Sequence, residues 1–213
     1  KHIIIASIFI FLHIGFSANS ADFNKDLRVI KEEIKRNDVS KAIKLLGDLK
    51  IENDNQQEKI DLLFGDIYLK INKPQKAIEF YEKAFMTSDS KIESLSELGL
   101  SEANLRQGNL EKAIFHAERS LNLNADSIRS KIVLAMAVTR NGEKNKALKM
   151  LEELYLSYKN NSEVNLAIAG YHSTFDNQKD AIKILDKFLK KFPTTIDVMD
   201  ELANLYWIEG DKA

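Results

Sequence analysis

The chain has 213 residues, of which 44% are hydrophobic and 30% are charged, and its formal net charge is −1. The hydrophobic content supports a folded chain, and the balanced charge argues against the basic footprint of a nucleic-acid-binding protein. Cysteine is absent, which excludes disulfides and thiolate metal sites without identifying the compartment.

Residues 1–21 differ in character from everything that follows. Lys1 and His2 precede an apolar run over residues 3–16, and small and polar residues follow up to residue 21. This order is typical of a secretory signal peptide, and the run is short for a membrane span, which needs about 20 residues. We therefore expect export, to the periplasm or cell envelope if the source is bacterial, with cleavage after Ser20 or Ala21. An uncleaved signal anchor is the main alternative.

From residue 22 onward, apolar residues recur at three-to-four spacing, which indicates amphipathic helices. No strand pattern appears, and no segment rich in Pro, Gly or Ser separates domains. The first two helices carry the apolar residues Leu27, Ile30 and Ile34, then Val39, Ile43, Leu46 and Leu49, and a loop is expected at Ile51–Gln57. The later expected helices are Ile60–Ile71, Gln75–Met86, Ile92–Gln107, Leu110–Leu123, Ser127–Arg140, Lys144–Lys159, Glu163–Phe175, Lys179–Phe192 and Ile196–Glu209.

A basic-alanine-aliphatic triplet recurs along these helices, with an acidic variant in its last copy. Its alanines are Ala42, Ala77, Ala113, Ala147 and Ala181, separated by 35, 36, 34 and 34 residues. A period near 34 is typical of helix–turn–helix repeats. When each alanine is set at position 20 of a 34-residue unit, position 8 is small in every unit except the first. Position 15 always tolerates the left-handed conformation that ends a helix. Its residues are Asn37, Asn72, Gly108, Gly142, Asp176 and Gly210.

The period and the residues at positions 8, 15 and 20 resemble the repeat pattern of the tetratricopeptide repeat family. The resemblance covers roughly Phe23 to the end, with units starting near residues 23, 58, 94, 128, 162 and 196. It implies an all-α fold, a right-handed α-α superhelix of about five helix–turn–helix units and a truncated sixth, forming one repeat domain over 22–213. The unit from Ser94 departs from the pattern, since Asn104 and Ser120 stand where tyrosine and alanine are usual. An irregular helical bundle with chance periodicity is the alternative.

The last expected helix has no partner in this sequence. Leu202, Ala203, Leu205 and Tyr206 form an apolar face that a following helix should cover. The register places the next marker alanine two residues beyond Ala213. We therefore expect the repeat array to continue.

No motif for catalysis, phosphate binding or dinucleotide binding is present. His116 has charged neighbours and is expected to be solvated, and His172 occupies an aromatic packing position. Acidic pairs such as Glu152-Glu153 are adjacent in sequence and do not face each other on a helix. We therefore expect no enzymatic activity, no cofactor and no metal.

The resemblance implies that positions 2, 5, 9, 12 and 13 of each first helix face a concave groove. Leu62 and Asp66 replace the lysine and asparagine with which one branch of the family clamps chaperone C termini, so that activity is not expected. The candidate groove residues are Asp66, Lys70, Leu98, Glu102, Arg106, Arg129, Met136 and Arg140.

We expect this groove to bind a protein or peptide, as an extended or helical segment that is acidic and partly apolar, with arginines contacting its acidic groups. Arg106 and Arg140 are expected to face solvent, so that their reversal to Glu should spare the fold. The predicted function is a non-catalytic protein–protein interaction scaffold, in envelope assembly or secretion. No nucleic acid is expected as a partner, and a membrane is expected only through an uncleaved signal anchor.

Two other hypotheses remain open at this point. The chain is the recruiting arm of a longer envelope enzyme, a protease or glycan-modifying protein, whose catalytic part lies beyond residue 213. Alternatively, the terminal repeat mediates self-assembly.

Overall fold

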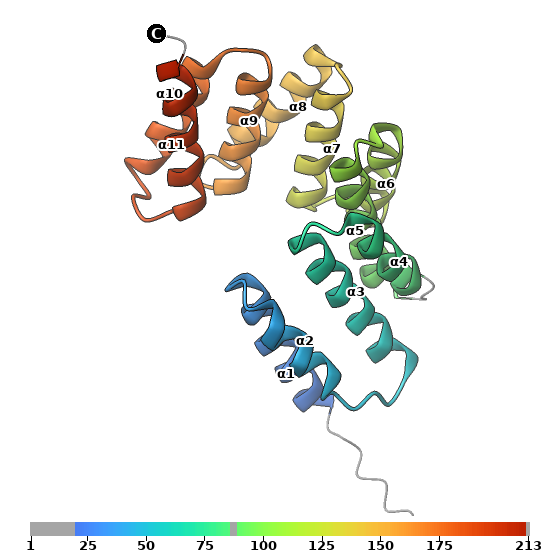
Figure 1. Ribbon diagram of the computed structural model, residues 1–213. Coiled ribbons are helices and arrows are strands. Elements are labelled where there is room, and N and C mark those ends of the chain that lie inside the picture. Colours follow the sequence, from blue (N-terminus) through green and yellow to red (C-terminus); the bar gives the residue numbers. More distant parts are fainter. Residues whose placement is uncertain (1–19, 86–88, 212–213) are drawn as a thin grey trace, which may run out of the picture. The chain divides into compact units, whose positions relative to one another are not determined.

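The computed structural model describes residues 20–85 and 89–211, and all regular structure in these ranges is α-helical (Figure 1). The predicted export segment lies outside the described residues except for Ser20 and Ala21, which begin the first helix. The helices are α1 (Ser20–Lys35), α2 (Val39–Gly47), α3 (Asp54–Lys70), α4 (Pro74–Phe85), α5 (Ser90–Gln107), α6 (Leu110–Leu123), α7 (Ile128–Arg140), α8 (Lys144–Ser157), α9 (Ser162–Thr174), α10 (Gln178–Leu189) and α11 (Ile196–Asp211).

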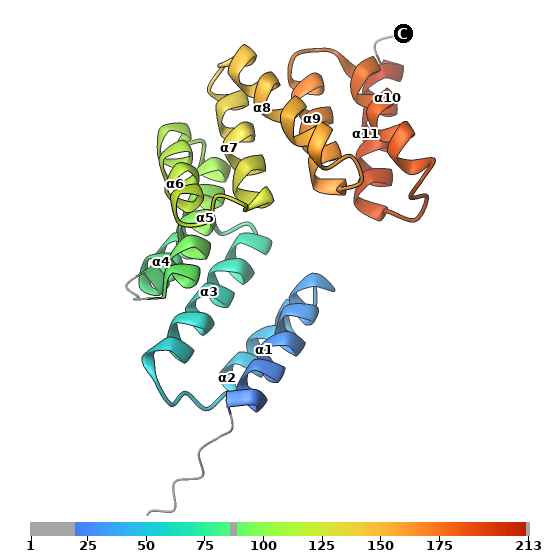
Figure 2. The same cartoon turned by 180° about the vertical axis from the view of Figure 1, so that it is seen from behind.

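The chain forms two compact units, one up to Lys50 and one from Ile51. In the first unit α1 packs against α2 and buries Phe23, Leu27 and Leu46. In the second unit each helix from α3 to α11 packs on the next, and the members of a pair such as α5 and α6 lie side by side (Figures 1 and 2). An all-helical tandem array is therefore the architecture of this unit, as the repeat predicts.

The prediction that position 15 of each unit takes the left-handed backbone conformation is confirmed at five of six residues. The backbone φ is positive at Asn37, Asn72, Gly108, Gly142 and Asp176. Each of these residues follows the first helix of a pair and lets the chain turn back. Gly210 differs, because it lies inside α11, which ends one residue later at Asp211. The prediction that this glycine ends the helix was wrong.

Side-chain caps explain where several helices begin. The Oδ1 atom of Asn53 accepts a hydrogen bond from the backbone N–H of Gln56 at 3.0 Å and so caps α3. This cap corrects the expected loop at Ile51–Gln57, because the helix starts at Asp54 within that stretch. Asn residues favour both loops and helix N-caps, so composition alone could not separate the two.

The marker alanines lie where the two helices of each pair cross. Ala42, Ala77, Ala113, Ala147 and Ala181 are each fully buried. Between α5 and α6 the small residue at position 8 is Ser101, whose hydroxyl donates to the backbone carbonyl of Ala113 at 2.7 Å. Serine therefore preserves the close crossing while its own hydrogen-bonding need is met.

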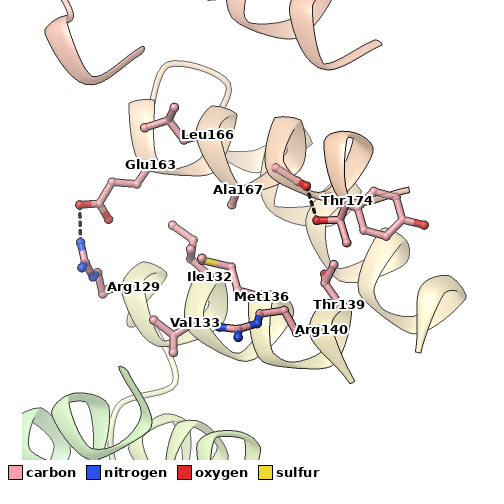
Figure 3. A pocket seen from close by; sticks show the side chains of 12 residues that line it. Arg129, Ile132, Val133, Met136, Thr139, Arg140, Glu163, Leu166, Ala167 and Thr174 are labelled. Carbon is pink, nitrogen blue, oxygen red and sulfur yellow. Dashed lines mark hydrogen bonds and ion pairs between the residues drawn. The ribbon is translucent and has the colours of Figure 1, made fainter. Parts of the chain in front are cut away.

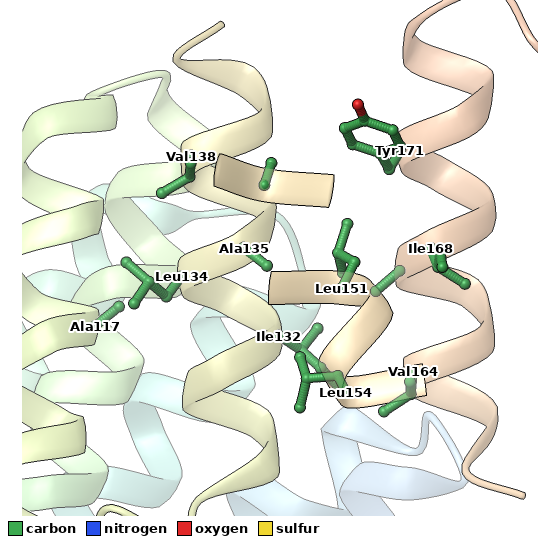
Figure 4. Close-up of a cluster of buried hydrophobic side chains, with 12 residues drawn as sticks. Ala117, Ile132, Leu134, Ala135, Val138, Leu151, Leu154, Val164, Ile168 and Tyr171 are labelled. Carbon is green, nitrogen blue, oxygen red and sulfur yellow. The ribbon is translucent and has the colours of Figure 1, made fainter. Parts of the chain in front are cut away.

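The buried side chains of the second unit form successive clusters along the array. One large cluster joins α6, α7, α8 and α9, and its members include Leu151, Val138 and Ile168 (Figure 4). A separate cluster continues through α9, α10 and α11. Because each pair covers the apolar face of its neighbour, stability depends on the interfaces between units as well as on each unit alone.

Tyr81 of α4 packs between two first helices. Its ring lies against Gly65 of α3 and Gly99 of α5, at positions where an added Cβ atom would overlap the ring. Its hydroxyl donates to Asp66 Oδ1 at 2.8 Å. Burial, and then the neighbouring Asp66 carboxylate, raise the pKa of Tyr81 well above its ordinary value. The two glycines are therefore needed for the approach of α3 and α5 to this ring.

The unit from Ser94 pairs a buried acidic side chain with two side chains of its second helix. Buried Glu97 accepts a hydrogen bond from Arg119 Nε at 2.8 Å and lies 2.6 Å from His116 Nδ1. The expectation that His116 is solvated was wrong, because its side chain is only 21% exposed. The acidic partner sits nineteen residues earlier on α5, which no pattern around His116 could reveal.

The apolar face expected on the last helix is divided in the structure. Leu202 and Leu205 are buried against the preceding helices, whereas Ala203 and Tyr206 are exposed. Trp207 is also exposed.

We expect Ala147→Leu to lower the free energy of unfolding by roughly 1–3 kcal/mol, because the added volume enters a filled helix crossing. Chemical denaturation followed by circular dichroism measures the change. Leucine at the exposed Lys149 of the same helix is the matched control and should change stability little. Equal effects at the two positions would contradict the close crossing.

Candidate functional site

The first helices of successive pairs contact one another, so that equivalent positions line up across the array. These contacts join α3 to α5, α5 to α7, α7 to α9 and α9 to α11. The eight predicted groove residues all lie on three of these helices. They are Asp66 and Lys70 on α3, Leu98, Glu102 and Arg106 on α5, and Arg129, Met136 and Arg140 on α7.

A pocket of about 310 Å³ lies between α7 and α9 on this side of the array (Figure 3). Three of the predicted residues line it, namely Arg129, Met136 and Arg140, and the other five lie outside it. The remaining lining residues are Ile132, Val133, Thr139, Glu163, Leu166, Ala167, Gly170, Tyr171 and Thr174. That these eight residues form a binding surface stays a prediction, because their positions alone do not show a bound partner.

The pocket has an apolar floor and an adaptable wall. Ile132, Val133 and Ala167 are buried in the core beneath it. Met136 is 41% exposed and stands at its side (Figure 3). An unbranched thioether side chain adjusts to the shape of what it contacts, so this wall can accommodate a ligand without backbone movement.

The hollow depends on small residues of α9. A Cβ atom added at Gly170 would meet no other atom within 4 Å, so this position opens onto empty space. Ala167, one turn earlier, contributes only a methyl group. At the groove position that Gly170 occupies, α3 and α5 carry Asp66 and Glu102. Missing side-chain volume on α9 therefore creates the pocket.

An ion-pair clip closes one end of the pocket. Arg129 Nε donates to Glu102 Oε1 at 2.8 Å, and Arg129 Nη1 donates to Glu163 Oε1 at 2.7 Å (Figure 3 draws the second). Burial lowers the pKa of Arg129, but the hydrogen bonds and charges of the two glutamates outweigh it and raise the pKa overall. The guanidinium charge is therefore already paired with two carboxylates of α5 and α9.

Arg106 and Arg140 share a different role, as both reach back to the preceding first helix. Arg140 Nη1 donates to the backbone carbonyl of Leu105 at 2.7 Å, and Arg106 Nη1 donates to the carbonyl of Leu69. Both carbonyls lie in the last turn of a helix, and each also accepts a backbone N–H, Leu69 from Asn72 and Leu105 from Gly108. Both side chains are exposed, as expected. The expectation that reversing both charges spares the fold stays a prediction, and the reversal would also remove the hydrogen bonds to these two carbonyls.

The far end of the pocket carries hydroxyl groups whose protons are already used. Thr139 Oγ1 donates to the carbonyl of Ala135, and Thr174 Oγ1 donates to that of Gly170, each at 2.7 Å. Tyr171 donates its hydroxyl to the carbonyl of Lys144 at 3.3 Å. These groups leave Arg140 as the charged donor at this end.

The pattern around the pocket was only partly readable from the sequence. The repeat register gives the groove-facing positions of α7 and α9, and hence most of the lining. The register did not show that the opening lies at α9, although a glycine inside a helix, which costs about 0.5–1 kcal/mol relative to alanine, was the available signal. Val133, Ala167 and Tyr171 fall outside the groove columns and were missed.

Within residues 20–85 and 89–211, no cluster of three or more His, Cys, Asp or Glu side chains could hold a metal ion. In the same ranges, no helix combines the length and apolar character needed to cross a membrane.

Comparisons with known proteins agree with this architecture. A family model described as tetratricopeptide repeat matches residues 62–88. No curated protein matches the sequence. The fold is similar to TTC0263, a thermophilic TPR protein of Thermus thermophilus, with a TM-score of 0.75, 17% identity, and coverage of 87% of this chain and 99% of that one.

Two further solved structures share the fold at lower similarity. YrrB, described as a TPR protein with an unusual peptide-binding site, has a TM-score of 0.50 and 14% identity, covering 86% of this chain and 93% of that one. MamA has a TM-score of 0.52 and 19% identity, covering 84% of this chain and 96% of that one. At such identities the likeness shows the fold alone.

We expect Gly170→Ala to raise the free energy of unfolding by about 0.5–1 kcal/mol, because alanine is the better helix former and the space is open. Gly99→Ala, also within a first helix, should lower it, since overlap with the Tyr81 ring costs roughly 1–3 kcal/mol. Denaturant titrations of the two variants measure the difference in sign. A loss of stability at Gly170 would contradict an open pocket.

Proposed function

We propose that this chain, which carries a tetratricopeptide repeat and folds as tetratricopeptide repeat proteins do, is a non-catalytic scaffold that binds a segment of another protein. The segment, extended or helical, lies across the first helices α5, α7 and α9 and contacts the pocket between α7 and α9. The array contributes a preformed surface, and its partner contributes the segment that is ordered on binding.

The observation that carries this proposal is the position of the pocket. It lies on the helices whose equivalent positions line up along the array, and its lining includes the exposed side chains of Arg129, Met136 and Arg140. Met136 leaves 41% of its surface exposed there, although its neighbour Val133 is buried. Pockets of roughly 300–1,000 Å³ with apolar walls and a few polar groups are typical binding sites.

We also propose that the protein works after export, in the assembly of cell-envelope components or in secretion. The basis is the composition of residues 1–21, with its charged start, apolar run and small-residue end. Mass spectrometry of the mature N terminus tests this part separately. A mature chain that still begins near Lys1 and shows no membrane association would overturn it.

Site-specific crosslinking tests the scaffold proposal. A photo-reactive amino acid at Met136 should crosslink a defined partner protein in the native cell. The matched position is Leu156 on the second helix α8, which is 67% exposed and apolar but lies outside the pocket lining. Crosslinks from Leu156 alone, with none from Met136, would place the binding surface elsewhere.

A further inference from the structure

We propose that the pocket between α7 and α9 receives an aromatic side chain of the partner, and that Arg140 binds a carboxylate next to that aromatic residue. This inference rests on the proposed scaffold function and names the chemistry of the partner segment. The partner would thus carry a short aromatic-acidic motif.

The size of the pocket favours an aromatic occupant. Its volume of about 310 Å³ is roughly twice that of the engineered cavity of about 150 Å³ that binds benzene. A single aromatic ring with the start of its backbone therefore fits, whereas an alanine or serine would leave most of the space empty. Voids of that kind forfeit the dispersion contacts of their lining.

The chemistry of the wall agrees with its size. Met136 presents a thioether, which contacts aromatic rings favourably with the sulfur about 5 Å from the ring. Arg140 lies beside Met136 along α7 (Figure 3), and a guanidinium plane can stack on an aromatic face. Ile132 and Val133 supply the remaining apolar contact from below.

The charge available to a partner is concentrated on Arg140. Arg129 is held by Glu102 and Glu163, so a partner carboxylate would have to displace an existing one. Within the described residues Arg140 forms no ion pair and donates one hydrogen bond, to the Leu105 carbonyl at 2.7 Å. Since a guanidinium carries five N–H donors, the remaining ones can bind a carboxylate while this bond is kept.

The position of Arg140 also fixes its orientation. Its bond to the end of α5 anchors a side chain that would otherwise be freely mobile. A pre-oriented donor loses less conformational entropy when the ligand arrives. We therefore place the partner's carboxylate at the Arg140 end of the pocket, opposite the end that the Arg129 ion pairs close (Figure 3).

The test uses the full chain and three blocked peptides, acetyl-Ser-Asp-Phe-Asp-Ser-amide and two controls with Asn-Phe-Asn or Asp-Ala-Asp as the central triplet. Binding is followed by NMR of methyl-labelled methionines, in which Met136 reports on the pocket and Met150 serves as an internal control. We expect a saturable shift at Met136 with the Asp-Phe-Asp peptide. The Ala control should bind at least about tenfold more weakly, and the Asn control about fivefold more weakly.

Two pairs of protein variants assign these effects to the pocket. Gly170→Leu fills the open space and should abolish the Met136 response, while Gly210→Leu places the same side chain at another open helical glycine and should not. Arg140→Gln removes the guanidinium charge while keeping a polar side chain, and should bind the Asp and Asn peptides equally. Thermal melts establish that each variant is folded.

Equal binding of the Phe and Ala peptides, or an unchanged response in Gly170→Leu, would overturn the aromatic assignment. Persistent preference for Asp over Asn in Arg140→Gln would overturn the carboxylate assignment. Crosslinking of a native partner at Met136 in either case would leave the scaffold function standing. Failure of this inference is therefore distinguishable from failure of that function.

Discussion

The close approach of the two helices in each pair is the constraint on which the rest of this structure depends. Five fully buried alanines, from Ala42 to Ala181, permit that approach, and a larger side chain at such a crossing would separate the helices. Once the pairs are closed, their remaining apolar faces can be covered only by neighbouring pairs, and an array results. The outward positions of the first helices then escape the core and are free to carry charge or to form a pocket.

The sequence predicted the array because these constraints are local and periodic. The buried alanines recur at a regular spacing, and so do the left-handed residues between paired helices. Each of these two signals depends on the backbone geometry within one unit. What the pattern could not show were contacts that join distant residues without a periodic signature. Glu97 meets His116 and Arg119 across two helices, and Tyr81 requires glycine at two positions in different first helices. The helix α3 was predicted, but its start at Asp54 was missed for another reason, because an asparagine such as Asn53 serves equally in a loop and in a cap.

The candidate site shows the same division between what repeats and what does not. Groove-facing positions repeat, so the register placed Arg129, Met136 and Arg140 on one side of α7. The pocket itself arises from a difference between units, since Gly170 replaces the acidic side chains that α3 and α5 carry at that position. A difference of this kind gains meaning only when the neighbouring atoms are known. The two arginines at the same register position, Arg106 and Arg140, make the same kind of contact, whereas Arg129 at another position makes ion pairs.

Three arginines on adjacent first helices illustrate how packing assigns separate roles to one residue type. Arg106 and Arg140 donate to the carbonyl ends of the preceding helices, which ties successive units together through charge-assisted hydrogen bonds. Arg129 instead joins Glu102 and Glu163 and so links α5, α7 and α9 at one point. A ligand at the α7–α9 pocket would touch both kinds of link, because Arg129 and Arg140 line it. The side chains that would contact the ligand are thus the same ones that hold neighbouring units to each other.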